Sequence, residues 1–228
     1  QIPDLGTKAE YATKIRLFAT EKGLFVSADM EQPPETLVER LTRRDDWVDR
    51  DLFGVTIDAS GEAKLGYWFY VALGNSLNDG KVLPERRFQR DWDGPWTAKA
   101  ARTATGWSAE MYLPWSMMDM PQRDGLRNMG FVASRMVSHR NQRYQWPGYG
   151  VTTKRYVSAF NRLQMDDVEP VRQKSVIPFI STTYDEVYND TDVRVGADFA
   201  WKPTPAAQIS ASVNPDFGAV ESDDVVLN

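Results

Sequence analysis

The chain has 228 residues, of which 42% are apolar and 26% charged, so it can build a packed core; it has no cysteine, which excludes disulfide bonds and thiol chemistry. Residues 171–228 hold four basic and nine acidic side chains, whereas residues 1–170 hold 23 of each, so the net charge of −5 lies entirely at one end. Because nucleic-acid binding needs a basic surface, we expect no nucleic-acid partner.

The first 170 residues read as short strands joined by tight turns. Hairpins are predicted over residues 14–28, 52–73 and 96–112, each around a turn that contains glycine, and a further strand over 128–137. Single helical turns are predicted at 34–40 and 114–118, where a proline suits the first helical position. Many short strands at close spacing indicate an all-β antiparallel sandwich. We expect this domain to end at 168–171, giving a domain of residues 1–170.

Residues 171–228 have the pattern of a second region. Between residues 193 and 201, apolar side chains alternate with small or polar ones, and the alternation continues over 208–214 after a turn at 202–205 that contains two prolines. We therefore expect a C-terminal β-hairpin appendage. Amphipathic strands of roughly ten residues suit the start of an outer-membrane β-barrel, and an ordinary half-buried hairpin is the alternative. Because two strands so near one end leave an edge without a partner, we expect the chain to be a piece of a longer protein.

The usual motifs of catalysis are absent from the sequence. It has no Gly-rich phosphate loop, no GxSxG and no HExxH, and its single histidine, His139, is interpreted as a solvated loop residue beside Arg140. Nothing distinguishes one carboxylic acid as a proton donor and another as a base, so a glycoside hydrolase is the less favoured reading. We expect a non-catalytic protein without a cofactor.

Two groups of carboxylates lie close together in the sequence. Asp45, Asp46, Asp49 and Asp51 form one, and Asp91 and Asp93 flank Trp92 in the other. Alternating acids in a loop can hold calcium through oxygen ligands, so a structural calcium ion is one interpretation. Aspartates that cap solvated loops are the preferred interpretation.

Seven of the eight tryptophans lie between residues 47 and 146. Trp68, Trp107 and Trp115 lie in or beside predicted strands and are interpreted as core. Trp47, Trp92 and Trp146 lie in polar loops, where an indole is costly unless it packs or binds a ligand. Each could be a structural plug, or its flat face could stack on a sugar ring while neighbouring Asp, Arg and Asn side chains bind the hydroxyl groups.

Four segments of the chain form a recognisable set of motifs: Arg43-Arg44-Asp45-Asp46, Asp51-Leu52-Phe53-Gly54-Val55-Thr56-Ile57-Asp58, Asp91-Trp92-Asp93-Gly94-Pro95-Trp96 and Gly106-Trp107-Ser108-Ala109-Glu110-Met111-Tyr112-Leu113-Pro114-Trp115. Together they resemble the family 9 carbohydrate-binding modules, in their divergent DOMON-like branch. Asn214-Pro215-Asp216-Phe217-Gly218-Ala219-Val220-Glu221 is similar to the opening of the β-barrel region that follows such a module in a family of bacterial outer-membrane proteins.

The resemblance implies a jelly-roll or DOMON-like sandwich that holds a terminal sugar between two tryptophans, aided by a glutamate, an arginine and an asparagine, with structural calcium. Carried over by position, Trp47 and Trp146 are the expected pair, with Arg143 in place of the asparagine. Trp92 and Asp93 are expected at the rim. Two positions depart from the family pattern: Gly54 stands where the glutamate is expected, and Tyr70 stands near the expected arginine.

The function implied by the resemblance is a non-catalytic carbohydrate-binding module beside an outer-membrane barrel. Its expected partners are an oligosaccharide or polysaccharide and its own C-terminal barrel, and its expected location is the bacterial cell envelope, on the periplasmic or the surface side. An association with glycoside hydrolases and with carbohydrate catabolism would follow from the proteins in which such modules usually occur. The alternative is a structural or regulatory domain that docks on the barrel without a sugar ligand.

Overall fold

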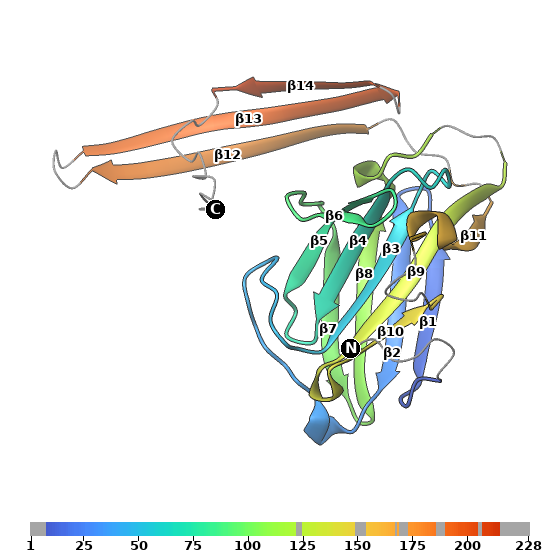
Figure 1. The fold of residues 1–228 in the computed structure, drawn as a ribbon. Helices are drawn as coiled ribbons and strands as arrows, with labels where there is room; N and C mark the ends of the chain where they lie inside the picture. Colours follow the sequence, from blue (N-terminus) through green and yellow to red (C-terminus); the bar gives the residue numbers. More distant parts are fainter. Residues whose placement is uncertain are drawn as a thin grey trace. The chain divides into compact units, whose positions relative to one another are not determined.

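The computed structural model describes residues 8–121, 125–148, 154–166, 168, 173–185, 190–204 and 207–214. The chain divides into two compact units: a sandwich unit of residues 1–171 and a C-terminal unit of residues 172–228 (Figure 1). The tail motif Asn214–Glu221 lies outside the described residues, apart from Asn214. In the described part of the chain, no helix is long and apolar enough to span a membrane.

The sandwich unit contains two antiparallel sheets, as expected. The first sheet has the order β1-β2-β8-β7, built from β1 (Thr13–Ala19), β2 (Gly23–Glu31), β7 (Thr97–Thr103) and β8 (Gly106–Pro114). The second sheet has the order β10-β9-β3-β4-β5-β6, with β11 also paired to β9. Its strands are β3 (Leu52–Asp58), β4 (Gly66–Ala72), β5 (Leu77–Leu83), β6 (Arg87–Gln89), β9 (Arg127–Val137), β10 (Gln142–Trp146) and β11 (Asn161–Met165).

Four single 3₁₀ turns connect these strands. They are η1 (Pro34–Thr36), η2 (Trp115–Met117), η3 (Ser138–Arg140) and η4 (Val157–Ala159). The first two fall within the predicted helical turns. His139 lies exposed in η3, where its Nδ1 is 3.3 Å from Gln32 Nε2, so its interpretation as a loop residue is confirmed.

The middle strands of the second sheet, β3 and β4, are buried on both faces. Alternate side chains of β3, β4 and β9, such as Phe53, Phe69 and Phe131, join the core between the sheets together with Trp107 and Trp115. The opposite side chains, which include Trp68 and Tyr70, form a second apolar cluster covered by residues 156–160. Strands buried on both faces are apolar throughout, and this explains why β3 and β4 carry continuous runs of apolar residues. The interpretation of Trp68, Trp107 and Trp115 as core is confirmed.

Buried aspartates fasten the two ends of β3. Asp51 accepts hydrogen bonds from Val38 N at 2.9 Å, Ser138 N at 2.8 Å and Gln32 Nε2 at 3.0 Å. Asp58 accepts hydrogen bonds from the turn that follows, among them Ala63 N at 2.8 Å. Asp51 therefore caps a loop, as preferred from the sequence, and Asp58, which belonged to neither group of carboxylates, does the same. Both do so from buried positions and not from solvated ones.

The C-terminal unit contains the expected hairpin, formed by β13 (Asp190–Thr204) and β14 (Ala207–Val213), and a third antiparallel strand, β12 (Gln173–Asp185). The order of the sheet is β12-β13-β14. The sequence did not predict β12, because residues 176–180 form a continuous apolar run that contains Pro178 and do not alternate with polar residues. β13 also continues to Thr204, through the residues expected to form a turn.

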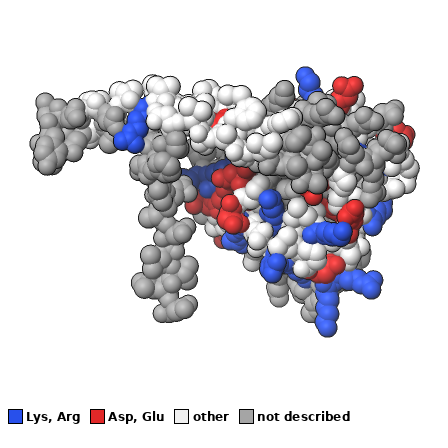
Figure 2. Space-filling model, turned by 90° about the horizontal axis from the view of Figure 1, so that it is seen from above, with Lys and Arg blue, Asp and Glu red and all other residues white. Residues whose placement is uncertain are grey.

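Charges of both signs are mixed on the sandwich. Figure 2 shows blue and red side chains interspersed on the visible face, without a large area of either sign. This distribution agrees with the equal numbers of acidic and basic residues in the first 170 positions.

Candidate functional site

The outer face of the second sheet, on the side away from the core, carries the position at which the resemblance expects a glutamate. Gly54 on β3 is there the cross-strand partner of Tyr70 on β4. A Cβ atom at residue 54 would lie 2.3 Å from Tyr70 Cδ1 and 2.4 Å from the carbonyl oxygen of Phe69. The Tyr70 ring therefore occupies the space that a side chain at residue 54 would need. Gly54 and Tyr70 are thus sterically linked, because the ring at residue 70 fits only where residue 54 has no side chain.

An arginine reaches this face from another strand. Arg143 on β10 donates from Nη2 to the Tyr70 hydroxyl and, at 3.4 Å, to Ser134 Oγ, and its guanidinium carbon is 5.5 Å from the centre of the Tyr70 ring. The Tyr70 hydroxyl raises the pKa of Arg143 above its ordinary value. Arg143 therefore supplies on β10 the guanidinium that the resemblance expected near residue 70 on β4.

Trp47 lies beside this group. Its ring centre is 5.9 Å from that of Trp68 and 6.0 Å from that of Tyr70, and the Arg90 guanidinium lies 5.2 Å from the Trp47 ring centre. The side chain remains 44% exposed. We call Trp47, Tyr70, Arg90 and Arg143 the Trp47 site. It joins an accessible indole to two guanidinium groups and a phenol.

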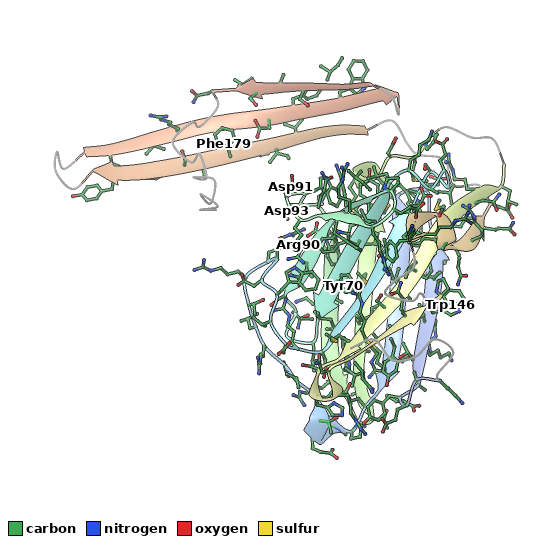
Figure 3. All side chains as sticks on the ribbon, viewed as in Figure 1. Tyr70, Arg90, Asp91, Asp93, Trp146 and Phe179 are labelled. Atoms are coloured by element: carbon green, nitrogen blue, oxygen red, sulfur yellow. The ribbon has the colours of Figure 1, made fainter. Side chains whose placement is uncertain are left out.

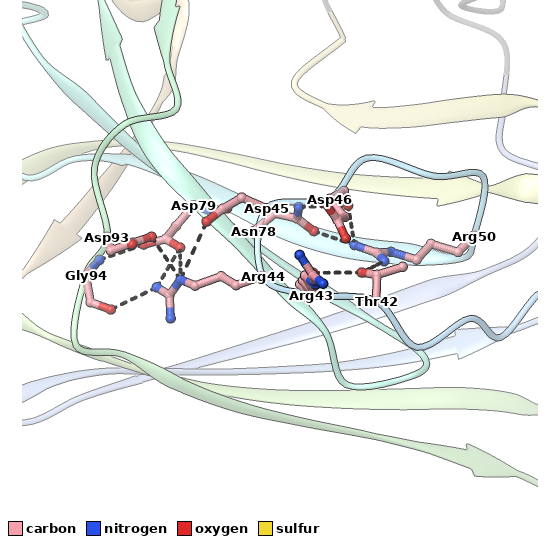
Figure 4. Close-up of polar contacts among 10 residues, drawn as sticks. All are labelled: Thr42, Arg43, Arg44, Asp45, Asp46, Arg50, Asn78, Asp79, Asp93 and Gly94. Carbon is pink, nitrogen blue, oxygen red and sulfur yellow. Dashed lines mark hydrogen bonds and ion pairs between the residues drawn. The ribbon is translucent and has the colours of Figure 1, made fainter. Parts of the chain in front are cut away.

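Two arginines hold the loop that carries Trp47. Arg44 donates from Nη2 to Asp79 Oδ1 at 2.6 Å on one side of the indole. On the other side, the buried Arg50 donates from Nη2 to Asn78 Oδ1 at 2.7 Å and to Asp46 O at 2.9 Å. Both arginines bind residues of β5 (Figure 4), and this ties the loop to the sheet. Trp47 is thereby held against Trp68 and Tyr70 on the outer face.

Trp146 lies on the other face of the same sheet. Its cross-strand partner is Ala133, which belongs to the core between the sheets, and its ring packs edge-on against Phe131 at 6.3 Å between centres. It is 60% exposed and lines a hollow of about 650 Å³ that Ile15 and Phe53 also line. Figure 3 shows Trp146 well away from Tyr70 and Arg90. The structure therefore does not bring Trp47 and Trp146 together into a two-tryptophan slot.

Trp92 lies partly buried beside the core. Its ring centre is 5.2 Å from that of Tyr67 and 6.1 Å from that of Phe69, and the Lys81 ammonium group is 5.3 Å away. These contacts give it the environment of a structural plug. The predicted site residues thus separate: Trp47 and Arg143 meet at Tyr70, whereas Trp146, Trp92 and Asp93 lie elsewhere.

Asp93 belongs to a cluster of three carboxylates. Oxygens of Asp45, Asp79 and Asp93 lie within 4.8 Å of one another, and Arg44 Nε donates to Asp93 Oδ1 at 3.0 Å (Figure 4). Burial raises the pKa of Asp45, and the Asp79 and Asp93 carboxylates raise it further. Burial also raises the pKa of Asp79, against the hydrogen bond from Gly94 N and the charge of Arg44.

The cluster does not fit a calcium ion as it is arranged. Calcium takes six to eight oxygen ligands. Here Arg44 occupies one oxygen of Asp79 and Gly94 N binds the other at 2.7 Å. The guanidinium therefore supplies the positive charge that a metal ion would bring.

Tyr70 and Arg90 belong to the Trp47 site, and Trp68 packs against Trp47, but the sequence did not mark any of the three as ligand-binding. Alternation in a strand places residues 68 and 70 on one face. Only the pairing of β3 with β4 shows that this is the face of Gly54. Arg90 had no comparable signal, since a loop carries it to Trp47.

No protein-family model matches the sequence, and no curated protein matches it. Among solved structures, a candidate carbohydrate-binding protein from Bacteroides uniformis ATCC 8492 matches with a TM-score of 0.54 and 12% identity, over 69% of this chain and 79% of that chain. A family 9 carbohydrate-binding module from Caldicellulosiruptor kristjanssonii matches in its cellotriose complex with a TM-score of 0.43 and 13% identity, over 61% of this chain and 66% of that chain. Its glucose complex matches with a TM-score of 0.44. The likeness to the Bacteroides uniformis protein confirms the expected fold: the sandwich unit has the all-β architecture of a candidate carbohydrate-binding protein.

Proposed function

We propose that the sandwich unit binds carbohydrate without catalysing a reaction, and that it does so at the Trp47 site. The observation that carries the proposal is an indole, 44% exposed, on the outer face of the second sheet. It lies beside Arg90 and Tyr70, and Arg143 contacts the Tyr70 ring and hydroxyl. An accessible aromatic ring with convergent polar groups is the usual composition of a small-ligand site. The fold shared with the Bacteroides uniformis protein supports the same ligand class.

The chemistry of the site suits a sugar ring. The apolar C–H face of a pyranose can pack on the Trp47 indole, while guanidinium N–H groups of Arg90 and Arg143 donate to its hydroxyl oxygens. The buried Tyr70 hydroxyl accepts a hydrogen bond from Arg143, and this bond fixes the orientation of the guanidinium group. The ring of Tyr70 closes the space over Gly54, so the sugar lies against Trp47 and not deep in the sheet.

Trp47→Ala tests the proposal, and Trp146→Ala is its matched control. Both residues are partly exposed tryptophans that belong to or border the second sheet, on opposite faces. In isothermal titration with a panel of neutral oligosaccharides, Trp47→Ala should weaken binding about tenfold or more. Trp146→Ala should keep the wild-type affinity for the same sugar.

Two results would count against the Trp47 site. Equal affinities of wild type and Trp47→Ala would show that the sugar binds elsewhere. A wild type that binds no glycan in the panel would favour the alternative, a structural or regulatory domain without a sugar ligand. The Tyr70 ring, which fills the space of a side chain at residue 54, would then account for the missing sugar site.

We also propose that the C-terminal unit belongs to a β-barrel of the bacterial outer membrane, which would put the sandwich in the cell envelope. By register, Val176, Ile180, Val193, Val195 and Val213 share one face of its sheet, and each is more than half exposed. Arg194, Asp198, Ser181 and Ser212 share the other face. One apolar and one polar face on long strands is the pattern of a membrane barrel, although Ile177 and Phe179 interrupt the polar face. Association with lipid vesicles is the measurement that bears on it.

A further inference from the structure

The outer face of the first sheet carries two parallel rows of side chains that run across its four strands. By register, Phe18, Phe25, Tyr112 and Thr97 form the first row. Two residues along each strand, Arg16, Ser27, Glu110 and Lys99 form the second. We call the two rows together the aromatic–polar face. It belongs to the sheet that does not carry the Trp47 site.

The first row is a line of exposed aromatic rings. The centres of Phe25 and Tyr112 are 4.6 Å apart in a stacked arrangement, and those of Phe18 and Phe25 are 6.3 Å apart. Phe18 is 66% exposed and Phe25 43%. Adjacent aromatic side chains that are exposed to solvent indicate a surface that binds a ligand or a partner.

The second row offers hydrogen-bonding groups that have little to bind within the chain. Glu110 and Lys99 are cross-strand partners, yet neither side chain makes a hydrogen bond or ion pair within the described part of the chain. Arg16 is paired with Asp29 at 2.6 Å, and both side chains are about half exposed. The row therefore presents an acceptor, a donor and a hydroxyl group next to the aromatic line. Together with Asp29, the partner of Arg16, it carries two positive and two negative side chains.

A hollow lies over these two rows. Its volume is about 720 Å³, and residues of all four strands line it, from Phe18 on β1 to Lys99 on β7. Because neighbouring strands are about 4.8 Å apart, four strands span roughly 14 Å, which accommodates more than one sugar unit.

We propose that the aromatic–polar face binds a neutral glycan chain lying across the four strands. A glycan chain has apolar C–H surfaces and a rim of hydroxyl groups, and the two rows present the matching surfaces side by side. The balanced charges of Arg16, Asp29, Glu110 and Lys99 favour an uncharged ligand over an acidic or basic one. The ligand class rests on the proposed carbohydrate-binding function, but the face is a second site that does not use Trp47.

Phe25→Ala and Glu110→Ala, made in the full chain, test the proposal. The probes are hydroxyethylcellulose, xylan and galactomannan in affinity gel electrophoresis, with Phe88→Ala as the control, an exposed phenylalanine on β6 of the other sheet. We expect Phe25→Ala to weaken retardation about fivefold or more and Glu110→Ala to weaken it about two- to fivefold, and Phe88→Ala to leave it unchanged. Retardation of the wild type should not change between about 50 mM and about 500 mM salt, because a neutral ligand forms no ion pairs with the protein that salt could screen. Near-ultraviolet circular dichroism checks that each variant is folded.

The outcomes separate this face from the Trp47 site. Loss of retardation in Phe25→Ala but not in Trp47→Ala supports the face even if short sugars do not bind at Trp47. Wild-type retardation of Phe25→Ala in every gel that retards the wild type overturns the proposal and leaves the Trp47 site standing. A wild type that no polysaccharide retards also overturns it. A wild-type dimer that Phe25→Ala converts to a monomer would assign the face to self-association instead.

Discussion

Asp45, Asp79 and Asp93 surround one guanidinium, so three carboxylates share a single positive charge from Arg44. Burial raises the pKa of both Asp45 and Asp79. A carboxyl group whose pKa is raised by folding adds stability below its unfolded pKa of about 3.9, and loses that contribution as the pH rises through the folded value. At neutral pH the ionised cluster therefore costs stability that it does not cost in acid.

Asp45→Asn should make the sandwich more stable at pH 7. The amide removes one charge, its Oδ1 can still accept from Asp79 N, and asparagine tolerates the positive φ of 61° at this residue. We expect the Tm to rise by about 1–3 °C at pH 7 and the difference to vanish near pH 3.5, measured by calorimetry. Asp91→Asn, at an exposed residue two positions from Asp93, is the control and should leave the Tm unchanged both at pH 7 and near pH 3.5. A lower Tm at pH 7 would contradict this account.

Arg143 and Trp146 show a limit of predicting the site from the sequence. Both were expected to bind the same sugar, because both lie in a segment that reads as a polar loop. The segment is strand β10, and residues 143 and 146 are an odd number of positions apart, so they must point to opposite faces. Their separation was thus implied by the sequence once β10 was known. β10 itself was missed because it is short and carries polar residues on both faces.

The sequence of strand β3 was sufficient to predict that it is a strand. Its bounds, Leu52–Asp58, and those of β4, Gly66–Ala72, lie within the hairpin predicted over residues 52–73. Continuous apolar sequence between polar turns predicts a strand buried on both faces. What the sequence could not supply is the cross-strand register, and the meaning of Gly54 depends on Tyr70 being its partner.

Gly54→Ala should destabilise the second sheet. The new Cβ would lie 2.4 Å from the carbonyl oxygen of Phe69, which is backbone and cannot rotate away. We expect a loss of about 1–3 kcal/mol in unfolding free energy, measured by urea denaturation. Tyr70→Ala in the same chain would remove the ring contact but not the carbonyl contact, so it should not restore wild-type stability.

Gly66→Ala on β4 is the matched control for this prediction. Its Cβ would first meet a side-chain atom, Val82 Cγ1 at 2.7 Å, and it meets no backbone atom among its nearest neighbours. It should cost less than Gly54→Ala. Equal costs at the two glycines would mean that general crowding of the sheet, and not the Phe69 carbonyl, sets the requirement for glycine at residue 54.

The whole molecule joins two units whose apolar residues are arranged differently. In the sandwich unit they gather in the core between the sheets and in the second cluster on the outer face of the second sheet. In the C-terminal unit large apolar side chains remain exposed along one face of a three-stranded sheet. The sandwich therefore has the interior of an independent domain, whereas the C-terminal sheet needs a further apolar surface over one face.

A lipid bilayer is the surface that we propose for this face, and vesicle flotation compares the units directly. Residues 1–228 should float with vesicles of phosphatidylethanolamine and phosphatidylglycerol, whereas residues 1–171 should remain in the dense fraction. Ile180→Lys combined with Val195→Lys, a cross-strand pair on the apolar face, should reduce flotation, because a lysine facing lipid costs about 2–4 kcal/mol at the centre of the bilayer. Ser212→Lys, on the polar face, should float as the wild type does. Flotation of residues 1–171 to the same extent as the full chain would assign lipid binding to the sandwich and remove the reason to place the C-terminal sheet in a membrane.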